Sequence, residues 1–221
     1  MTPALIAEVE LFNNIESAWE PARIYENAGD CHVDDIEAKW LPELRSRAAE
    51  VRRKHIGAWG LDHVGYQREL GELNIQDSHW DWRRKFVVNA GNLSVRSFVL
   101  EADGSVQAVM SLAMGERCKI ASQVGQHLAY VEYLSVAPWN RKPLRDPRVY
   151  KGIGTTMIQL SVAISQDEEF QGRVGLHSLS QAEPFYRGCG MTDLDIDPNK
   201  EGLRYFEFTP DQAVAYSNGN I

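Results

Sequence analysis

Residues 127–158 constrain the fold more than any other stretch of this chain. Apolar and aromatic residues dominate 128–136, which predicts a buried strand. Residues 151–156 read Lys-Gly-Ile-Gly-Thr-Thr and lead into a predicted helix over 153–166 with an apolar face. The first N–H groups of a helix have no intrahelical partner, and glycines let an anion approach them closely. The stretch therefore predicts an α/β fold with a phosphate-binding turn, and a tight strand-to-helix turn without a ligand is the alternative.

Strands and one hairpin are predicted on both sides of this stretch. The hairpin is marked by Asp103-Gly104, a pair typical of two-residue turns between antiparallel strands. Antiparallel strands followed by a strand–helix–strand crossover predict a mixed sheet with helices on both faces. The predicted strands are 4–12, 93–102, 106–114, 128–136, 173–179 and 203–208, and a short helix is predicted over 181–188.

The region between the first two strands reads mostly helical. Asp34 or Asp35 is the predicted cap of a first helix, which Pro42 should kink or restart. Asp77 or Ser78 is the predicted cap of a second helix. Five of the six tryptophans lie here, as core residues or as contacts for a ligand.

A second motif follows the predicted crossover. It reads Pro-Phe-Tyr-Arg-Gly-Cys-Gly-Met over 184–191. In order and spacing, this run and the Val-Tyr-Lys-Gly-Ile-Gly-Thr run over 149–155 resemble the GCN5-related N-acetyltransferase (GNAT) family. The resemblance covers roughly 93–208. It departs from the family where the phosphate loop usually begins with Arg or Gln, because Val149 stands there and Arg148 just before it is the candidate replacement.

The resemblance implies a fold and a division of the chain. The implied fold class is α/β (mixed α+β), with a mostly antiparallel six- to seven-stranded sheet that splays after its fourth strand, over 128–136. We expect one GNAT-like domain over 1–221, with 13–92 as an enlarged helical region on the acceptor side. Residues 93–208 would form the acetyl-CoA-binding core.

The resemblance also implies the residues that bind acetyl-CoA, as a co-substrate and without a metal. The pantetheine would lie beside backbone groups of the fourth strand, and the pyrophosphate at the helix N-terminus. The implied contacts are Leu134, Ser135, Val136, Arg148, Lys151, Gly152, Ile153, Gly154, Thr155 and Ser180. The loop over 141–151 carries five basic residues and one acid, which suits either a cationic collar for the phosphates or a solvated loop.

Two residues are candidates for acid–base chemistry. Glu132 lies among apolar and aromatic residues, and burial of a carboxylate favours its protonated form. We expect it to act as the base, directly or through water, and the alternative is a structural or solvent-exposed carboxylate. Tyr186 is the candidate acid for the departing thiolate, and a packing role is its alternative. A covalent Cys189 mechanism is disfavoured, because no neighbouring sequence marks a histidine partner.

Composition limits the partners and the compartment. The formal charge of −8 lacks the basic footprint of a nucleic-acid binder, so nucleic acid is expected only as part of the acceptor. Three cysteines without disulfide or metal spacing suit a reducing, cytoplasmic environment. No apolar run is long enough to span a membrane, and the first residues lack the basic start of a signal peptide.

The resemblance implies an acetyl-CoA-dependent N-acetyltransferase acting on a primary amine in a small molecule or a protein, and the composition favours a cytoplasmic location. A catalytically silent acyl-CoA-binding or sensing module is the first alternative, and an α/β anion binder that does not use CoA is the second. Edge strands near the C-terminus are compatible with a homodimer.

Overall fold

A computed structural model describes residues 2–219 and divides them into two units. The first unit contains residues 2–90, 99–108 and 135–151, and the second contains 91–98, 109–134 and 152–219. Strands β5 (Val95–Ala102), β6 (Ser105–Ala113) and β7 (Ala129–Val136) contribute residues to both units. The sequence expectation of one domain stays a prediction.

The first unit contains a long antiparallel hairpin. Strand β1 (Ala4–Asn13) pairs with β2 (Ala18–Glu26), with a bulge between Leu5 and Ala7. On its other edge, β1 pairs with the short strand β8 (Tyr150–Lys151). The strand order in this unit runs β6-β5-β2-β1-β8. Strand β2 corrects the sequence prediction, which gave this segment to the helical region.

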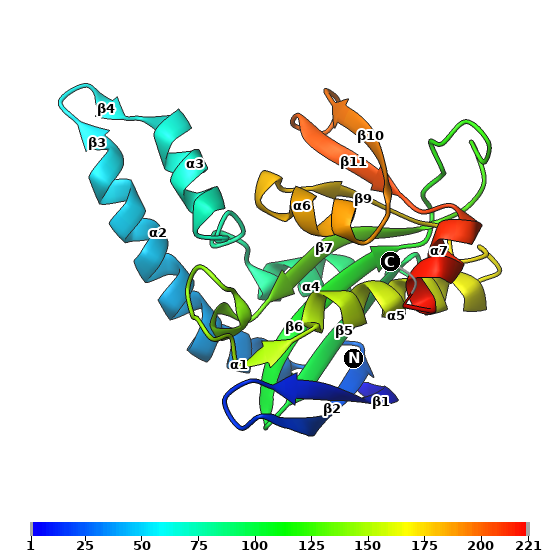
Figure 1. The fold of residues 1–221 in the computed structure, drawn as a ribbon. Helices are drawn as coiled ribbons and strands as arrows, with labels where there is room; N and C mark the ends of the chain where they lie inside the picture. Colours follow the sequence, from blue (N-terminus) through cyan, green and yellow to red (C-terminus); the bar gives the residue numbers. More distant parts are fainter. Residues whose placement is uncertain (1, 220–221) are drawn as a thin grey trace. The chain divides into compact units, whose positions relative to one another are not determined.

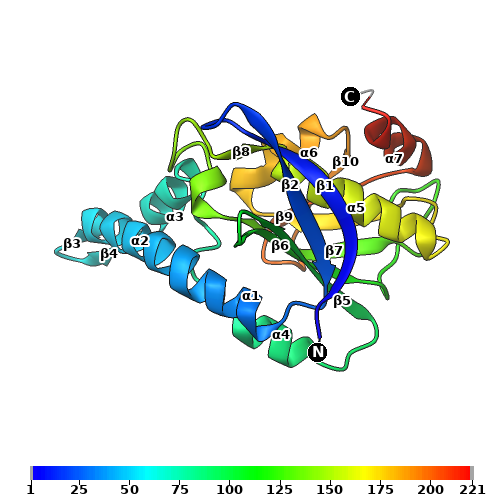
Figure 2. The same ribbon diagram turned by 90° about the horizontal axis from the view of Figure 1, so that it is seen from below.

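Helices fill most of the remaining first unit. Helices α2 and α3 lie side by side and are joined through β3 and β4 (Figures 1 and 2). The predicted break at Pro42 is present as a π-helical segment over Ile36–Trp40, because proline cannot donate the hydrogen bond that a regular α-helical turn needs. The elements are α1 (Asp30–Asp35), α2 (Leu41–His55), β3 (Ile56–Gly57), β4 (Gly60–Leu61), α3 (His63–Glu72), α4 (Trp82–Asn89) and a 3-10 turn (Pro138–Asn140).

The predicted helix caps in this region are wrong. Helix α1 begins after Gly29, so the two aspartates expected at its start lie inside the helical segment. Helix α4 is capped by Asp81, whose side chain accepts a hydrogen bond from the backbone N–H of Arg84 at 2.8 Å. Asp77 is buried and forms an ion pair instead. Asp81 has the chemistry expected of a cap but lies three or four residues after the predicted one, whereas Gly29 provides no side-chain hydrogen bond.

The second unit carries the crossover that the sequence predicted. Its strand order runs β10-β11-β9-β7-β6-β5, in which β7 and β9 are parallel. Strand β10 was not predicted, because its alternate residues are mostly exposed acids. The elements are α5 (Ile153–Asp167), β9 (Val174–Ser178), a 3-10 turn (Ser180–Ala182), α6 (Glu183–Gly188), β10 (Thr192–Asp197), β11 (Leu203–Glu207) and α7 (Pro210–Ser217).

The fold class is confirmed, and the strand number is corrected. The described strands include nine in one mostly antiparallel sheet rather than six or seven, since β2, β8 and β10 were not expected. The Asp103-Gly104 hairpin is also confirmed. Both residues have positive φ angles, of 50° and 62°, as a tight hairpin turn of this kind requires.

The parallel pair β7 and β9 separates partway along its length. Its ladder joins Ala129 with Val174, Tyr130 with Gly175 and Val131 with Leu176, and then ends. Both strands continue past this point, β7 to Val136 and β9 to Ser178. This separation corresponds to the splay expected after the fourth predicted strand.

Each unit has its own set of buried apolar side chains. In the first unit, Trp40 is fully buried and donates its indole N–H to the carbonyl of Val106 at 3.1 Å. In the second unit, Phe206 of β11 and Phe208, the residue that follows this strand, are fully buried. Among residues 2–219, no helix combines the length and the apolar character needed to cross a membrane.

Candidate functional site

The first turn of α5 has the geometry of an open anion-binding turn. Gly152, the residue before the helix, has a φ of +82°, and a Cβ atom there would meet no atom within 4 Å. Its carbonyl accepts hydrogen bonds from the backbone N–H and the hydroxyl of Thr156, at 2.8 and 3.2 Å. The N–H groups of Ile153, Gly154 and Thr155 come before the first intrahelical bond, so they remain as donors.

Gly154, the second glycine of this turn, is the point where the two sequence motifs, 149–155 and 184–191, come into contact. A Cβ atom on Gly154 would lie 3.1 Å from the ring of Phe185, so the absence of a side chain lets that ring approach. The hydroxyl of Tyr216 on α7 donates to the carbonyl of Thr155 at 3.3 Å. Glycine at 154 therefore brings α6 against the first turn of α5.

Tyr186 follows Phe185 on α6 and is buried. The two rings lie 5.1 Å apart, and the ring of Phe206 lies 5.8 Å from Tyr186 on another side. Burial and the neighbouring Cys189 raise the pKa of Tyr186 above its ordinary value. Because its pKa is raised, the Tyr186 hydroxyl stays protonated and can act as a proton donor.

Glu132 lies on β7, directly after the ladder with β9 ends. Its side chain is half-buried and accepts a hydrogen bond from the hydroxyl of Ser111 at 3.2 Å. The pKa of the neighbouring Tyr133 is raised, first by burial and then by the negative charge of Glu132. A carboxylate with one weak donor keeps acceptor capacity for a second partner.

The remaining predicted residues are divided between the units. In the second unit, Leu134 is half-buried on β7, and Ser180 is exposed at the turn before α6. In the first unit, Val136 and Arg148 are half-buried and Lys151 is exposed. The ammonium of Lys151 lies 5.9 Å from the centre of the Phe12 ring.

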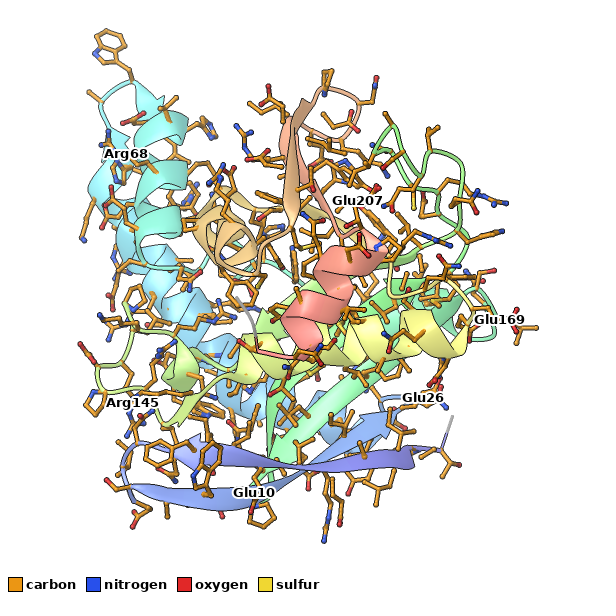
Figure 3. The ribbon with its side chains drawn as sticks, turned by 45° about the vertical axis from the view of Figure 1, so that its right-hand side comes forward. Glu10, Glu26, Arg68, Arg145, Glu169 and Glu207 are labelled. Atoms are coloured by element: carbon orange, nitrogen blue, oxygen red, sulfur yellow. The ribbon has the colours of Figure 1, made fainter. Side chains whose placement is uncertain are left out.

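Ser135 has a structural role that the sequence did not indicate. Its side chain is buried, donates to Asp77 at 2.7 Å and accepts from Arg141 at 2.9 Å. Arg141 bonds both oxygens of Asp77, at 2.6 and 2.8 Å, and donates to the carbonyls of Asn74 and Val136, each at 2.7 Å. Arg141 is therefore already paired and does not belong to the expected cationic collar. The exposed basic residues of that loop include Lys142, Arg145 (Figure 3) and Lys151.

Only the end of β7 could have suggested this network. A serine in an otherwise apolar strand signals a buried hydroxyl that needs a partner. The sequence does not say that the partner stands 58 residues earlier.

Comparisons with known proteins add solved structures only. No protein-family model and no curated protein sequence matches the chain. A predicted acetyltransferase with acetyl-CoA from Clostridium acetobutylicum is 16% identical, covering 79% of this chain and 92% of its own, with a TM-score of 0.45. A GCN5-related N-acetyltransferase from Ralstonia eutropha JMP134 is 20% identical, covering 77% and 92%, with a TM-score of 0.44.

A third solved structure is the PaiA N-acetyltransferase from Thermoplasma acidophilum in complex with coenzyme A. It is 16% identical and covers 83% of this chain and 97% of its own, with a TM-score of 0.41. All three TM-scores are below 0.5.

Proposed function

We propose that the chain is an acetyl-CoA-dependent N-acetyltransferase that transfers the acetyl group directly to a primary amine in a ternary complex. The contact between Phe185 and Gly154 supports this proposal most strongly. It sets the helix that carries a protonated phenol, Tyr186, against a turn with free backbone donors. The backbone donors of the turn suit the pyrophosphate, and the phenol of Tyr186 suits a leaving thiolate.

The pyrophosphate would accept hydrogen bonds from the N–H groups of Ile153, Gly154 and Thr155, with Gly152 leaving the approach open. Arg148 and Lys151 would supply positive charge, and Ser180 would touch the cofactor. The pantetheine would run beside the backbone of Leu134, Ser135 and Val136. No metal takes part in this proposal, and the protein would act in the cytoplasm.

The reaction sets two tasks for the side chains. A lysine-like amine must lose a proton before it attacks, which costs about 4–5 kcal/mol at pH 7. Glu132 would accept that proton, and Tyr186 would donate one to the sulfur as the thioester breaks. Holding amine and thioester together would supply roughly 7–11 kcal/mol of the barrier reduction.

The first test is the melting temperature with and without acetyl-CoA. At 100 times its dissociation constant, the ligand should add about 2.7 kcal/mol, which is a rise of several degrees. Turnover is then followed by the release of free thiol with a panel of primary amines. No shift in a folded protein would overturn the proposal and favour an anion binder that does not use CoA.

A second candidate function is a catalytically silent acyl-CoA-binding module. The hydrogen bond from Ser111 favours it, because it gives Glu132 a structural partner. The variants Glu132→Gln and Tyr186→Phe separate the two functions. An enzyme loses turnover by about 100-fold or more while its thermal shift with acetyl-CoA is retained. A silent module shows no turnover in any form.

A further inference from the structure

A second group of polar side chains forms a chain of hydrogen bonds in the second unit. The hydroxyl of Tyr130 lies 2.8 Å from Nδ1 of His177. Nε2 of His177 lies 3.1 Å from Oδ2 of Asp197, which also accepts from the ammonium of Lys119 at 2.6 Å. We call Tyr130, His177 and Asp197 the Tyr130 relay.

In the relay, Tyr130 donates a hydrogen bond to His177, and His177 donates one to Asp197. Hydrogen bonds from Lys119, the backbone of Asn199 and His177 hold the pKa of Asp197 far below its usual range, so its carboxylate only accepts. Nε2 of His177 must then carry the hydrogen and donate to Asp197. Nδ1 is left as an acceptor, and Tyr130 donates to it. This is the order found in catalytic triads, in which a histidine takes the proton of a hydroxyl group and a carboxylate orients the histidine.

The relay lies on the same face of β7 as Glu132. Alternate residues of a strand share a face, and the Cα atoms of Tyr130 and Glu132 are about 7 Å apart on that basis. His177 is the first residue of β9 beyond the end of the β7–β9 ladder, as Glu132 is on β7. All three residues of the relay are half-buried, and the side chains of His177 and Asp197 are 4% and 15% exposed. Tyr130 shares its strand and face with Glu132, so it is the member placed to meet a substrate.

Amide formation from an ammonium group releases two protons from one nitrogen. One must leave before attack and the other after the new C–N bond has formed. Glu132 can accept only one of them in each turnover. We propose that Tyr130 is a further catalytic residue that accepts the second proton, with His177 and Asp197 as the positioning residues behind it. This inference rests on the proposed transfer to an amine.

The proposed step balances in atoms and charge. The N–H bond of the tetrahedral intermediate breaks as its proton passes to the oxygen of Tyr130. The O–H bond of Tyr130 breaks as its own proton passes to Nδ1 of His177. The resulting imidazolium is stabilised by the carboxylate of Asp197. The intermediate expels the thiolate, which takes a proton from Tyr186. After the product leaves, Tyr186 regains a proton from water, whereas Glu132 and, through Tyr130, the imidazolium release theirs to water, so one proton is released per turnover.

Several charged groups face the relay and set its response to pH. Burial lowers the pKa of His177; the hydrogen bond that His177 donates to Asp197 opposes this shift, and the charges of Lys119 and Lys200 reinforce it. Burial, Glu116 and Glu132 raise the pKa of Tyr130, so that it acts as a neutral hydroxyl that passes a proton on. His177 is therefore a free base at neutral pH, and proton transfer to it should fail only in more acidic solution.

The test compares two relay variants with a matched control in the full chain. The variants are Tyr130→Phe and His177→Gln, and the control is Tyr133→Phe, which removes a phenol from the neighbouring, opposite-facing position of β7. The probes are acetyl-CoA and the amine with the highest turnover among spermidine, glucosamine and a peptide with a free N-terminus. We measure the thermal shift with acetyl-CoA, kcat, and the pH dependence of kcat/KM.

We expect both relay variants to keep the acetyl-CoA shift and to lose kcat by about 100-fold, with the control close to wild type. His177→Gln should also remove a fall in kcat/KM on the acidic side of neutrality, which loss of a purely structural contact would not do. A kcat within threefold of wild type in Tyr130→Phe overturns the inference.

A second measurement does not depend on activity. Nitrogen NMR of the wild-type imidazole should show the hydrogen of His177 on Nε2. A hydrogen on Nδ1 reverses the direction of the Tyr130 bond and overturns the relay. Absence of an acetyl-CoA shift in wild type instead overturns the proposed function, so the two failures are distinguishable.

Discussion

The buried ion pair between Asp77 and Arg141 allows a sharp stability prediction. Both side chains are 4% exposed, and the carboxylate accepts two hydrogen bonds from Arg141 and one from Ser135. In Asp77→Asn the charge is lost, and an amide NH₂ replaces an oxygen that faces donors. Arg141 then remains as an uncompensated buried charge, so we expect a loss of roughly 3–5 kcal/mol in the free energy of unfolding.

Thermal and urea unfolding measure this loss. For a chain of this size, such a change lowers the melting temperature by roughly 10 °C. The control is Asp34→Asn, because Asp34 and Arg83 lie as close, at 2.6 Å, but are 68% and 41% exposed. That variant should leave the midpoint unchanged. Equal effects in the two variants would refute the claim that burial, rather than distance, sets the strength of the pair.

The pH dependence of the same pair has a definite sign. Burial alone would raise the pKa of Asp77, but the charge and hydrogen bonds of Arg141 hold it below its ordinary value. A depressed folded-state pKa contributes stability above the unfolded value, near 3.9, and that contribution is lost as the pH falls through the folded-state value. The difference between wild type and Asp77→Asn should therefore be full at pH 7 and shrink below about pH 4. A constant difference would contradict the assignment.

Two further substitutions test other parts of the structure. Gly152→Ala forces an alanine to a φ of +82°, so it should cost roughly 1–2 kcal/mol in unfolding experiments and weaken acetyl-CoA binding in a thermal-shift assay; an unchanged midpoint would contradict the left-handed turn. Glu207→Gln should cost about 1–3 kcal/mol, because the buried carboxylate (Figure 3) accepts from Lys119, Ile120, Gln123 and Tyr205 and the new NH₂ faces donors. An unchanged midpoint there would show that water reaches the group.

Local patterns predicted the parts of the fold whose cause lies within a few residues. The turn at Asp103-Gly104 needs positive φ angles at both positions, and aspartate followed by glycine is a pair that adopts them readily. The helix after Gly152 begins where the apolar face begins. The break at Pro42 follows from the missing N–H of proline. None of these depends on a distant partner.

The parts that the sequence did not predict depend on distant partners. Strand β8 has two residues and exists because β1 pairs with it across more than 130 positions. Asp77 has the composition of a cap, but its pairing with Arg141 outweighs that local preference. No local pattern marks His177 as a site residue, and its bonds to Tyr130 and Asp197 need strands β7, β9, β11 and β10 in register. The roles of Glu132 and Tyr186 stay predictions that the proposed variants test.

Three of the five points at which the chain passes from one unit to the other lie within strands β5, β6 and β7. Each unit is therefore made from three separate stretches of chain, and no single cut in the gene yields either one whole.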